Sequence, residues 1–320
     1  MAARRRRAGL LCFLLFAASA PADAWNAAGH RLSAAIAWRE MAPATRAAAG
    51  RLLADHPEYT RWTARAPAGD ADYAAFLAAA TWPDDIKRDR RFHDDGDAPT
   101  ATLPGFPDMA RHRRWHYADH RLDDGTRLGG GELDRRLPQL IETLRDPRAS
   151  AGERAYALLW LLHLVGDAHQ PLHVASRVDA AGNDDAGGNR LWVETPLHPR
   201  RPAMTLHAYW DDLPGPPWLR GERLEAAATM LLDAAPADVP AGEAVDDAAG
   251  WIAESLELAR SVAYADLAGE APAIDARYHD RALAAAKTQI VRAGRRLARL
   301  LDALSPATDV SRETVSRETR

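Results

Sequence analysis

Apolar residues recur three and four positions apart along most of the chain, which is the spacing of amphipathic helices. Only 190–195 and 203–207 resemble strands, and these two segments could form a small ribbon. The pattern predicts an all-α fold, with a single mainly helical domain over 25–304 and a small β-ribbon. The predicted helices cover 30–42, 45–56, 70–82, 131–146 with a kink at Pro138, 150–167, 223–235, 246–267 and 280–304.

Both ends of the chain differ from this pattern. Residues 4–7 are arginines, 10–18 form a short apolar run, and Ala22-Asp23-Ala24 has the small residues of a cleavage site. Residues 1–24 are therefore predicted to be a signal peptide that is cleaved before Trp25. We expect a periplasmic or secreted protein with no membrane attachment after cleavage. The polar tail, residues 305–320, offers little surface to bury and is predicted to be disordered.

Composition and charge narrow the possible functions. The chain has 320 residues, of which 47% are hydrophobic and 27% charged, as in globular proteins. Loss of the signal peptide, with its four Arg and one Asp, changes the formal net charge from −4 to −7. A basic groove for long nucleic acid is therefore not expected. Cys12, the only cysteine, lies in the signal peptide, so a metal site must use His, Asp, Glu or backbone groups.

The stretch 163–173, HLVGDAHQPLH, carries unusual chemistry for an apolar helix. His163 and Asp167 are four residues apart, so a helix places both on one face. Pro171 should end or bend that helix, and His173 follows the bend. Polar groups are costly to bury without partners, so the stretch indicates a metal cluster. The alternative is a helix C-terminus with solvated histidines.

Four other places repeat this chemistry. His207 and Asp211 have the same spacing of four, His116 lies between aromatic residues, Asp84 follows a Trp-Pro pair, and His30 lies near the expected new N-terminus. Taken singly, these residues could be a surface pair, a core histidine or a helix-terminus loop. Together the candidate donors exceed the needs of one tetrahedral zinc and suit two or three metals. They are Trp25, His30, Asp84, His116, His163, Asp167, His173, His207 and Asp211.

The chain resembles the secreted single-strand-specific zinc nucleases, the nuclease S-one/P-one family, which are related to the bacterial zinc phospholipases C. The resemblance covers nearly the whole mature chain and rests on seven motifs. They are Trp25-Asn-x-x-Gly-His30, Trp82-Pro-Asp84, Trp115-His116-Tyr-x-Asp119, His163-x-x-Gly-Asp167-x-His-Gln-Pro-Leu-His173, Asp185-x-Gly-Gly-Asn189, Leu206-His207-x-x-Trp-Asp211 and Ala293-Gly-Arg-Arg-Leu-Ala298.

The resemblance implies a mainly helical fold that binds three zinc ions. One ion would be held by Asp84, His116, His163 and Asp167. A second would be held by the free amine and carbonyl of Trp25, by His30 and by the shared Asp167. The third would be held by His173, His207 and Asp211. Because the amine of Trp25 is free only after cleavage, the precursor would have an incomplete site.

The implied activity is endonucleolytic hydrolysis of single-stranded DNA and RNA to 5′-phosphorylated products, with 3′-nucleotidase activity on 3′-nucleotides. Zinc would lower the pKa of a water that attacks phosphorus and would neutralise charge on the phosphate and the leaving oxygen. Asp84 and Asp167 would be catalytic as well as metal-binding. Tyr117 and Asp119 match the family's base-stacking and base-bonding positions, and Asn189 would also bind substrate; stacking requires an unpaired base. For Tyr117 the alternative is core packing.

The chain departs from the family at three points. Asn26 stands where many relatives have glycine, a change with no expected consequence. Lys87 stands where arginine is expected, and it keeps the positive charge but loses the two-pronged contact of a guanidinium. Lys87 is therefore a candidate catalytic residue facing the phosphate, and the alternative is a solvated helix residue. The cysteines of fungal members are missing. His169 is expected to support the ligands rather than bind metal.

Two rival functions remain at this point. A zinc phospholipase C would end its last ligand pair in Glu and have a longer gap between the terminal Trp and the first His. Asp211 and the short gap between Trp25 and His30 favour the nuclease. A non-catalytic zinc-binding helical protein would not require Tyr117 and Asp119 beside the metals. No protein partner is indicated, and a monomer is the simplest expectation.

Overall fold

The computed structural model describes residues 25–234, 239, 242–269 and 271–305, and its helices and small sheets confirm the predicted mainly helical fold. The expected signal peptide and all but the first residue of the expected tail lie outside these ranges. The α-helices are α1 Ala27–Glu40, α2 Pro43–Ala54, α3 Tyr59–Thr63, α4 Ala71–Ala79, α5 Trp82–Asp85, α6 Leu133–Arg145, α7 Ala151–Ala168, α8 Leu206–Asp212, α9 Glu222–Ala234, α10 Ala248–Leu258 and α11 Ala276–Leu304.

Short helical turns and strands join these helices. The 3₁₀ turns are η1 Ile86–Arg88, η2 Arg113–His116 and η3 Pro171–His173, and a π-helical turn, η4, covers Ala259–Ala263. The strands are β1 His120–Arg121, β2 Ala175–Ser176, β3 Trp192–Glu194 and β4 Ala203–Thr205. They form two separate two-stranded sheets, one of β1 with β2 and one of β3 with β4.

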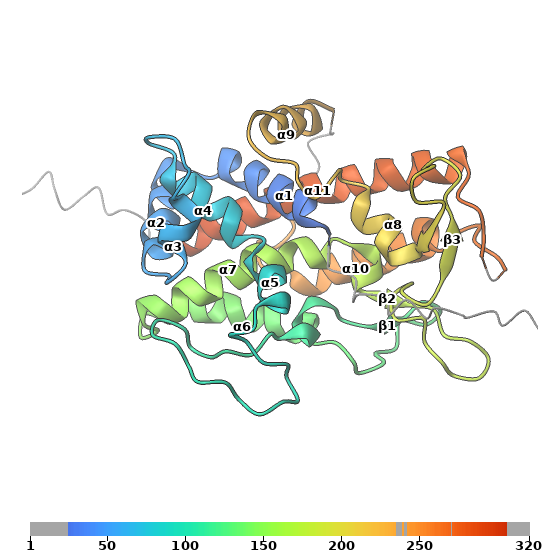
Figure 1. The fold of residues 1–320 in the computed structure, drawn as a ribbon, viewed down its shortest axis with the longest axis horizontal. Coiled ribbons are helices and arrows are strands. Elements are labelled where there is room, and N and C mark those ends of the chain that lie inside the picture. The colour runs from blue at the N-terminus through green and yellow to red at the C-terminus, as the bar shows by residue number, and fades with distance from the viewer. Residues whose placement is uncertain (1–24, 235–238, 240–241, 270, 306–320) are drawn as a thin grey trace, which may run out of the picture.

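Helix α7 lies in the middle of the molecule and packs against α1, α2, α4, α5, α6, α10 and α11 (Figure 1). Ser150 begins it with a capping box, in which its hydroxyl accepts from the backbone of Glu153 and the Glu153 carboxylate accepts in return. From Ala155 to Ala168 every residue is buried, as expected for a helix that is apolar on all sides. The helix ends three residues before Pro171, where the sequence predicts a boundary.

The first and last helices of the described chain, α1 and α11, lie side by side (Figure 1). Each contributes buried residues to both apolar clusters of the protein, one around α7 and the other around α8. Directly after α1, the backbone N–H of Ala42 donates to the carboxylate of Asp302 at 3.0 Å. The two ends of the described chain are therefore held together along one long contact.

The predicted β-ribbon exists, but it is shorter than the pattern suggests. Strands β3 and β4 pair antiparallel, with Val193 opposite Met204. The hydroxyl of Thr205 accepts from the backbone N–H of Ala208 at 3.2 Å and so caps α8. The prediction of strand over 203–207 is therefore wrong at its last two residues, which begin α8 and place His207 on a helix.

Several other elements differ from the predictions. The segment 70–82 is divided between α4 and α5, and the helix predicted over 246–267 changes to the π-helical turn η4 after Leu258. Pro138 lies inside α6 without ending it. Helix α3 and the parallel pair β1–β2, which matches His120 with Ala175, have no counterpart in the predictions.

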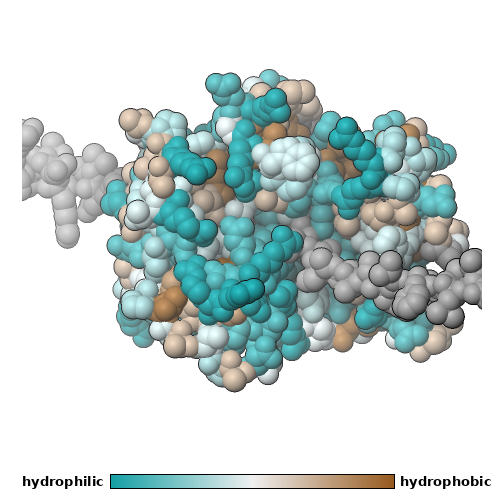
Figure 2. All heavy atoms as spheres, viewed as in Figure 1, coloured by the Kyte–Doolittle hydropathy of each residue, from teal (hydrophilic) through white to brown (hydrophobic). Residues whose placement is uncertain are grey.

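The surface is hydrophilic over most of the face shown in Figure 2, with hydrophobic residues scattered among polar ones. Among the described residues, no helix combines the length and the apolar composition needed to cross a membrane.

Candidate metal centre

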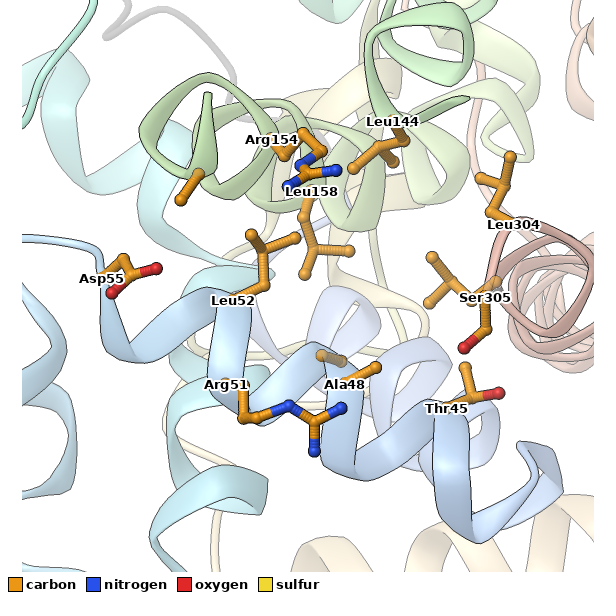
Figure 3. Close-up of a pocket in the computed structure, with 13 residues that line it drawn as sticks. Thr45, Ala48, Arg51, Leu52, Asp55, Leu144, Arg154, Leu158, Leu304 and Ser305 are labelled. Carbon is orange, nitrogen blue, oxygen red and sulfur yellow. The ribbon is translucent and has the colours of Figure 1, made fainter. Parts of the chain in front are cut away.

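Two cavities lie away from the predicted site. One, of about 300 Å³, opens between α2, α7 and α11 and is lined by leucines such as Leu52 and Leu158, with Arg154 beside them (Figure 3). The other, of about 790 Å³, lies against α8 and includes Tyr209 and Trp218. Neither is lined by a residue that the sequence predicts for the site. The chemistry is concentrated instead in a buried polar cluster at the C-terminal end of α7.

His163 and Asp167 project from the last turns of α7, and both side chains are fully buried. The Nε2 atom of His163 lies 3.3 Å from Asp167 Oδ2 and 3.6 Å from Asp84 Oδ1. Its other ring nitrogen, Nδ1, bonds the carbonyl of Ala80 at 2.8 Å. The predicted pair on one helix face is present, and the alternative of solvated histidines is wrong for this stretch.

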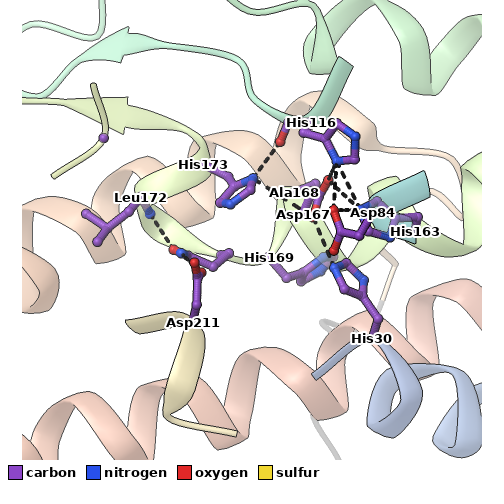
Figure 4. A network of polar contacts seen from close by, with 12 residues as sticks. His30, Asp84, His116, His163, Asp167, Ala168, His169, Leu172, His173 and Asp211 are labelled. Atoms are coloured by element: carbon purple, nitrogen blue, oxygen red, sulfur yellow. Dashed lines mark hydrogen bonds and ion pairs between the residues drawn. The ribbon is translucent and has the colours of Figure 1, made fainter. Parts of the chain in front are cut away.

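The carboxylate of Asp167 lies at the centre of the cluster and faces four imidazole rings (Figure 4). The nearest nitrogens are 3.1 Å away on His116, 3.3 Å away on His163, 3.4 Å away on His30 and 3.9 Å away on His173. A buried carboxylate surrounded by nitrogen atoms is suited to bridge two metal ions. Helix α1, turn η2, helix α7 and turn η3 supply these rings.

Among the described residues there are three groups of side chains that could each hold a metal ion, and within each group the donor atoms lie within 4.8 Å of one another. The first two share His163 and therefore form one continuous cluster, whereas the third lies around α8. The groups are His30, Asp84 and His163; His116, His163 and Asp167; and His173, His207 and Asp211. All eight of the predicted side-chain ligands belong to these groups. His30 lies close to Asp84 and His163 as well as to Asp167. The structure therefore does not assign the ligands of the first cluster to one ion or the other.

The third group is built from η3 and α8. His173 and His207 approach each other through their Nε2 atoms at 3.1 Å, and His207 Nε2 lies 3.6 Å from Asp211 Oδ2. The exposed fractions are 3% for His173, 5% for His207 and 5% for Asp211. These values exclude the alternative of a surface pair for His207 and Asp211.

Hydrogen bonds fix the orientation of three of the histidines. His163, His173 and His207 each direct Nδ1 at a backbone carbonyl, of Ala80, His116 and Gly187 respectively. Such a bond holds the proton on Nδ1 and leaves Nε2 free to bind a metal, as is usual for metal-binding histidines. All three Nε2 atoms point into the clusters.

The charge state of the rings suits metal binding. Burial, together with the neighbouring Lys87, lowers the pKa of His163 to about 3, and burial lowers that of His207 to about 4. Burial also holds the pKa values of His30, His116 and His173 well below the usual range. Neutral imidazoles offer the lone pair that a metal requires. Among the described residues, neither ring nitrogen of buried His30 has a hydrogen-bond partner, which is costly, and a bound cation would provide a partner for one of them.

Lys87 lies beside the first cluster rather than in solvent. It is 8% exposed, and its Nζ donates to Asp84 Oδ1 at 2.7 Å, one turn away on η1. The alternative of a solvated helix residue is therefore wrong. The contact places a fixed positive charge next to a predicted metal ligand, and Lys87 as a catalytic residue stays a prediction.

The predicted substrate-binding residues lie on the loops around the cluster. Tyr117 and Asp119 follow η2 directly, and both are half-buried. Asp119 has a positive φ of 62° and accepts from the hydroxyl of Ser176 at 2.7 Å. Asn189 bonds its own loop through the carbonyl of Ala186 at 2.9 Å. Tyr117 is thus only partly buried in the core, and its role in substrate binding stays a prediction.

Trp25 is buried with 1% exposure and belongs to the apolar cluster around α8. The next residue, Asn26, donates its backbone N–H to the carbonyl of Asp211 at 3.2 Å. This bond places the start of the expected mature chain beside a ligand of the third group. Metal binding by the amine and carbonyl of Trp25 stays a prediction.

Two supporting residues were not predicted individually. Gln170 is fully buried, donates to Asp211 Oδ1 at 2.8 Å and accepts from the backbone of Leu172 at 2.6 Å. Gly166 lies where an added Cβ would be 2.8 Å from Nδ1 of His30, so only glycine leaves room for that ring. Both residues stand inside the motif that carries His163 and His173, which is the signal that could have identified them.

His169 supports the turn after α7, as expected, through a partner that the sequence did not identify. Its Nδ1 bonds the carbonyl of Val165 at 2.7 Å, and Arg296 donates to its Nε2 at 2.7 Å. Arg296 also pairs with Glu243 at 2.8 Å and Glu254 at 2.7 Å. Burial and the charge of Arg296 lower the pKa of His169 to about 4. The network connects α11 to the segment 163–173, which carries three of the eight side-chain ligands.

Comparison with models of protein families places the chain beside known proteins. The model of a protein family described as S1/P1 Nuclease matches residues 25–305. A search of the curated proteins finds no match.

Proposed function

Because the chain belongs to the S1/P1 nuclease family, we propose that it is a zinc-dependent endonuclease that hydrolyses single-stranded DNA and RNA to 5′-phosphorylated products. Membership makes it a nuclease, a hydrolase acting on phosphodiester bonds. The proposed specificity also includes 3′-nucleotidase activity. The observation that carries the proposal is the buried set of histidines and aspartates around Asp167 and Asp211.

Three zinc ions would be held by the eight side chains of the three groups together with the amine and carbonyl of Trp25. The donor set fits zinc, which prefers imidazole nitrogen and carboxylate oxygen when no thiolate is present. Bound zinc supplies an activated water near neutral pH and neutralises charge on the phosphate and the leaving 3′ oxygen.

The protein's own residues then position the reaction. Asp167 would be a ligand shared by two ions, because its carboxylate lies 3.4 Å from His30 and 3.1 Å from His116. Asp84 lies at the edge of the same cluster, with 12% of its side chain exposed, and would orient the attacking water. Lys87 would place its ammonium against the phosphate, where negative charge increases during the reaction.

Recognition of single strands would come from the loop after η2. Tyr117 would stack on a base and Asp119 would bond its edge, with Asn189 contacting the same nucleotide. A stacked, paired base cannot reach such a platform, whereas an unpaired base can. The half-buried positions of Tyr117 and Asp119, one and three residues after His116, support this assignment.

The setting of the enzyme is part of the proposal. Residues 1–24 would direct it to the periplasm or the exterior, where it would act as a monomer, free of the membrane. Processing there would release the amine of Trp25 and complete the zinc site.

Initial rates on five substrates test the function. We expect rapid cleavage of single-stranded DNA and RNA, release of phosphate from a 3′-mononucleotide, slow cleavage of duplex DNA and no release of phosphocholine from phosphatidylcholine. Hydrolysis of phosphatidylcholine alone would identify a phospholipase C. Tight zinc binding without turnover of any of the five would identify a non-catalytic zinc protein.

Substitution of Lys87 is expected to alter kcat without altering zinc content. Lys87→Ala removes the ammonium beside Asp84 and should lower kcat on a single-stranded oligonucleotide by roughly 10- to 1000-fold, as for other donors that act in the transition state. Lys87→Arg should keep or raise kcat, since a guanidinium bonds two phosphate oxygens. The measurement is kcat for each variant after its zinc content has been determined.

The control for Lys87 is Arg90→Ala, which removes an exposed cation three residues further along the chain. Its kcat should stay within about twofold of the parent, as for most surface substitutions. An unchanged kcat in Lys87→Ala would remove this residue from the mechanism and leave the role of zinc untouched.

A further inference from the structure

Besides the bonds that its carbonyl accepts at the start of α1, Asn26 makes four hydrogen bonds at the point where the mature chain would begin. Its side-chain Oδ1 accepts from the backbone N–H of Ala28 at 2.9 Å and caps α1. Its Nδ2 donates to Asp212 Oδ1 at 3.1 Å and to the carbonyl of Gly215 at 2.8 Å. Its backbone N–H donates to the carbonyl of Asp211 at 3.2 Å. One of these bonds is local, and three reach the C-terminal end of α8 and the turn after it.

The partners of Asn26 belong to the third metal group or directly follow it. Asp211 carries a predicted zinc ligand, and Asp212 is the last residue of α8. Asn26 therefore fastens the start of α1, which carries His30, to the helix that carries Asp211. The group that contains His30 and the group that contains Asp211 are thereby connected through Asn26, which is not itself a predicted metal ligand.

The preceding residue, Trp25, is held on its other side by packing. Its indole is buried, and an added Cβ at Gly29 would lie 2.7 Å from Trp25 Cβ and 3.2 Å from Pro214. The ring is therefore enclosed between α1 and the turn after α8. Between this packing and the bonds of Asn26, the backbone of Trp25 has little freedom, although a chain terminus is usually mobile.

We propose that Asn26 is a positioning residue that fixes the amine and carbonyl of Trp25 for zinc and couples that ion to the group around Asp211. The inference rests on the proposed zinc role of Trp25. Glycine at this position would keep only the bonds made by the backbone, among them the one to Asp211. The three hydrogen bonds of the Asn26 side chain would therefore restrict the motion of the chain terminus.

Asn26→Ser tests the proposal, because serine caps a helix about as well as asparagine but lacks the amide that reaches Asp212 and Gly215. The variant is made in two backgrounds, the processed protein that begins at Trp25 and a form with one Met before Trp25. Zinc affinity is measured by competition with a chromophoric chelator, and bound zinc is counted by mass spectrometry. In the processed protein we expect the weakest-held ion to lose roughly 10- to 100-fold in affinity, as for other residues that orient metal ligands.

In the Met-extended background the same substitution should change zinc affinity by less than about twofold, because the amine is already displaced. Ser150→Ala is the matched control: it removes the cap at the far end of α7, and should lower the unfolding temperature but leave zinc affinity unchanged. An equal loss of affinity in both backgrounds, or no loss in the processed one, overturns the proposal. Hydrolysis of single-stranded DNA by the parent protein tests the proposed function separately.

Discussion

Exhaustive chelation of the zinc-loaded protein is expected to abolish cleavage of single-stranded DNA and to lower the unfolding temperature by many degrees. The proposed ligands extend from Trp25 to Asp211, so bound ions would cross-link α1, α5, α7 and α8. A ligand present at 100 times its Kd stabilises by about 2.7 kcal/mol per site, and about 1 kcal/mol shifts the unfolding temperature by about 2–4 °C in a domain of this class. Loss of three ions should therefore lower it by roughly 15 to 30 °C.

Re-addition of zinc is the control for chelation. Stoichiometric zinc should restore both the rate and the unfolding temperature. Magnesium should restore neither, because it prefers oxygen ligands and five of the eight side-chain ligands are imidazoles. Full activity in a protein shown to contain no zinc would contradict the proposal of three zinc ions. A normal unfolding temperature in that protein would show that the buried clusters do not depend on metal.

A single Met before Trp25 is expected to leave the protein folded but nearly inactive. The contacts that hold this segment use the buried indole of Trp25 and the backbone N–H and side chain of Asn26, and none of them uses a terminal amine at Trp25. The extended protein lacks only that amine, which becomes a peptide nitrogen and cannot bind zinc. We expect two bound ions in place of three, with kcat lowered by two orders of magnitude or more, as when a major electrostatic contribution is removed.

The comparison uses one preparation. Removal of the extra Met by an aminopeptidase should restore the third ion and the rate, and circular dichroism should show the same helical content before and after. Equal zinc content and equal rates in the extended and trimmed forms would exclude Trp25 as a ligand.

The helical pattern predicts most elements because their signals are local. Helix α7 is the clearest case, since its capping residue Ser150, its apolar run and Pro171 all agree with one another. The predictions are wrong where contacts between residues far apart in the sequence determine the secondary structure. Strand β1 pairs with β2 across more than fifty residues, and nothing near His120 or Ala175 indicates such a partner. The start of α8 depends on a cap by Thr205, a residue type equally common in strands.

The same division holds for the site. Spacing alone predicts that His163 and Asp167 share a face, and likewise His207 and Asp211. Spacing cannot predict that His30 and Asp84 reach the same cluster, because separate helices bring them there, and this expectation came from the resemblance to a family. The contacts of Gln170 and Arg296 were missed because each depends on a partner more than forty residues away.

The long contact between α1 and α11 has a consequence for when this nuclease can become active. Helix α1 is among the first parts of the chain to leave the ribosome, and α11 is the last helix of the described chain to do so. Bringing together two helices so far apart in the sequence is slow. The loss of chain entropy is offset by packing only after both helices have formed. The contact between α1 and α11 therefore forms only late in folding. If the chain is exported before it folds, as the proposed role of residues 1–24 implies, its metal ligands would be far apart until export is complete, and the cell's own nucleic acids would be spared while the enzyme is made.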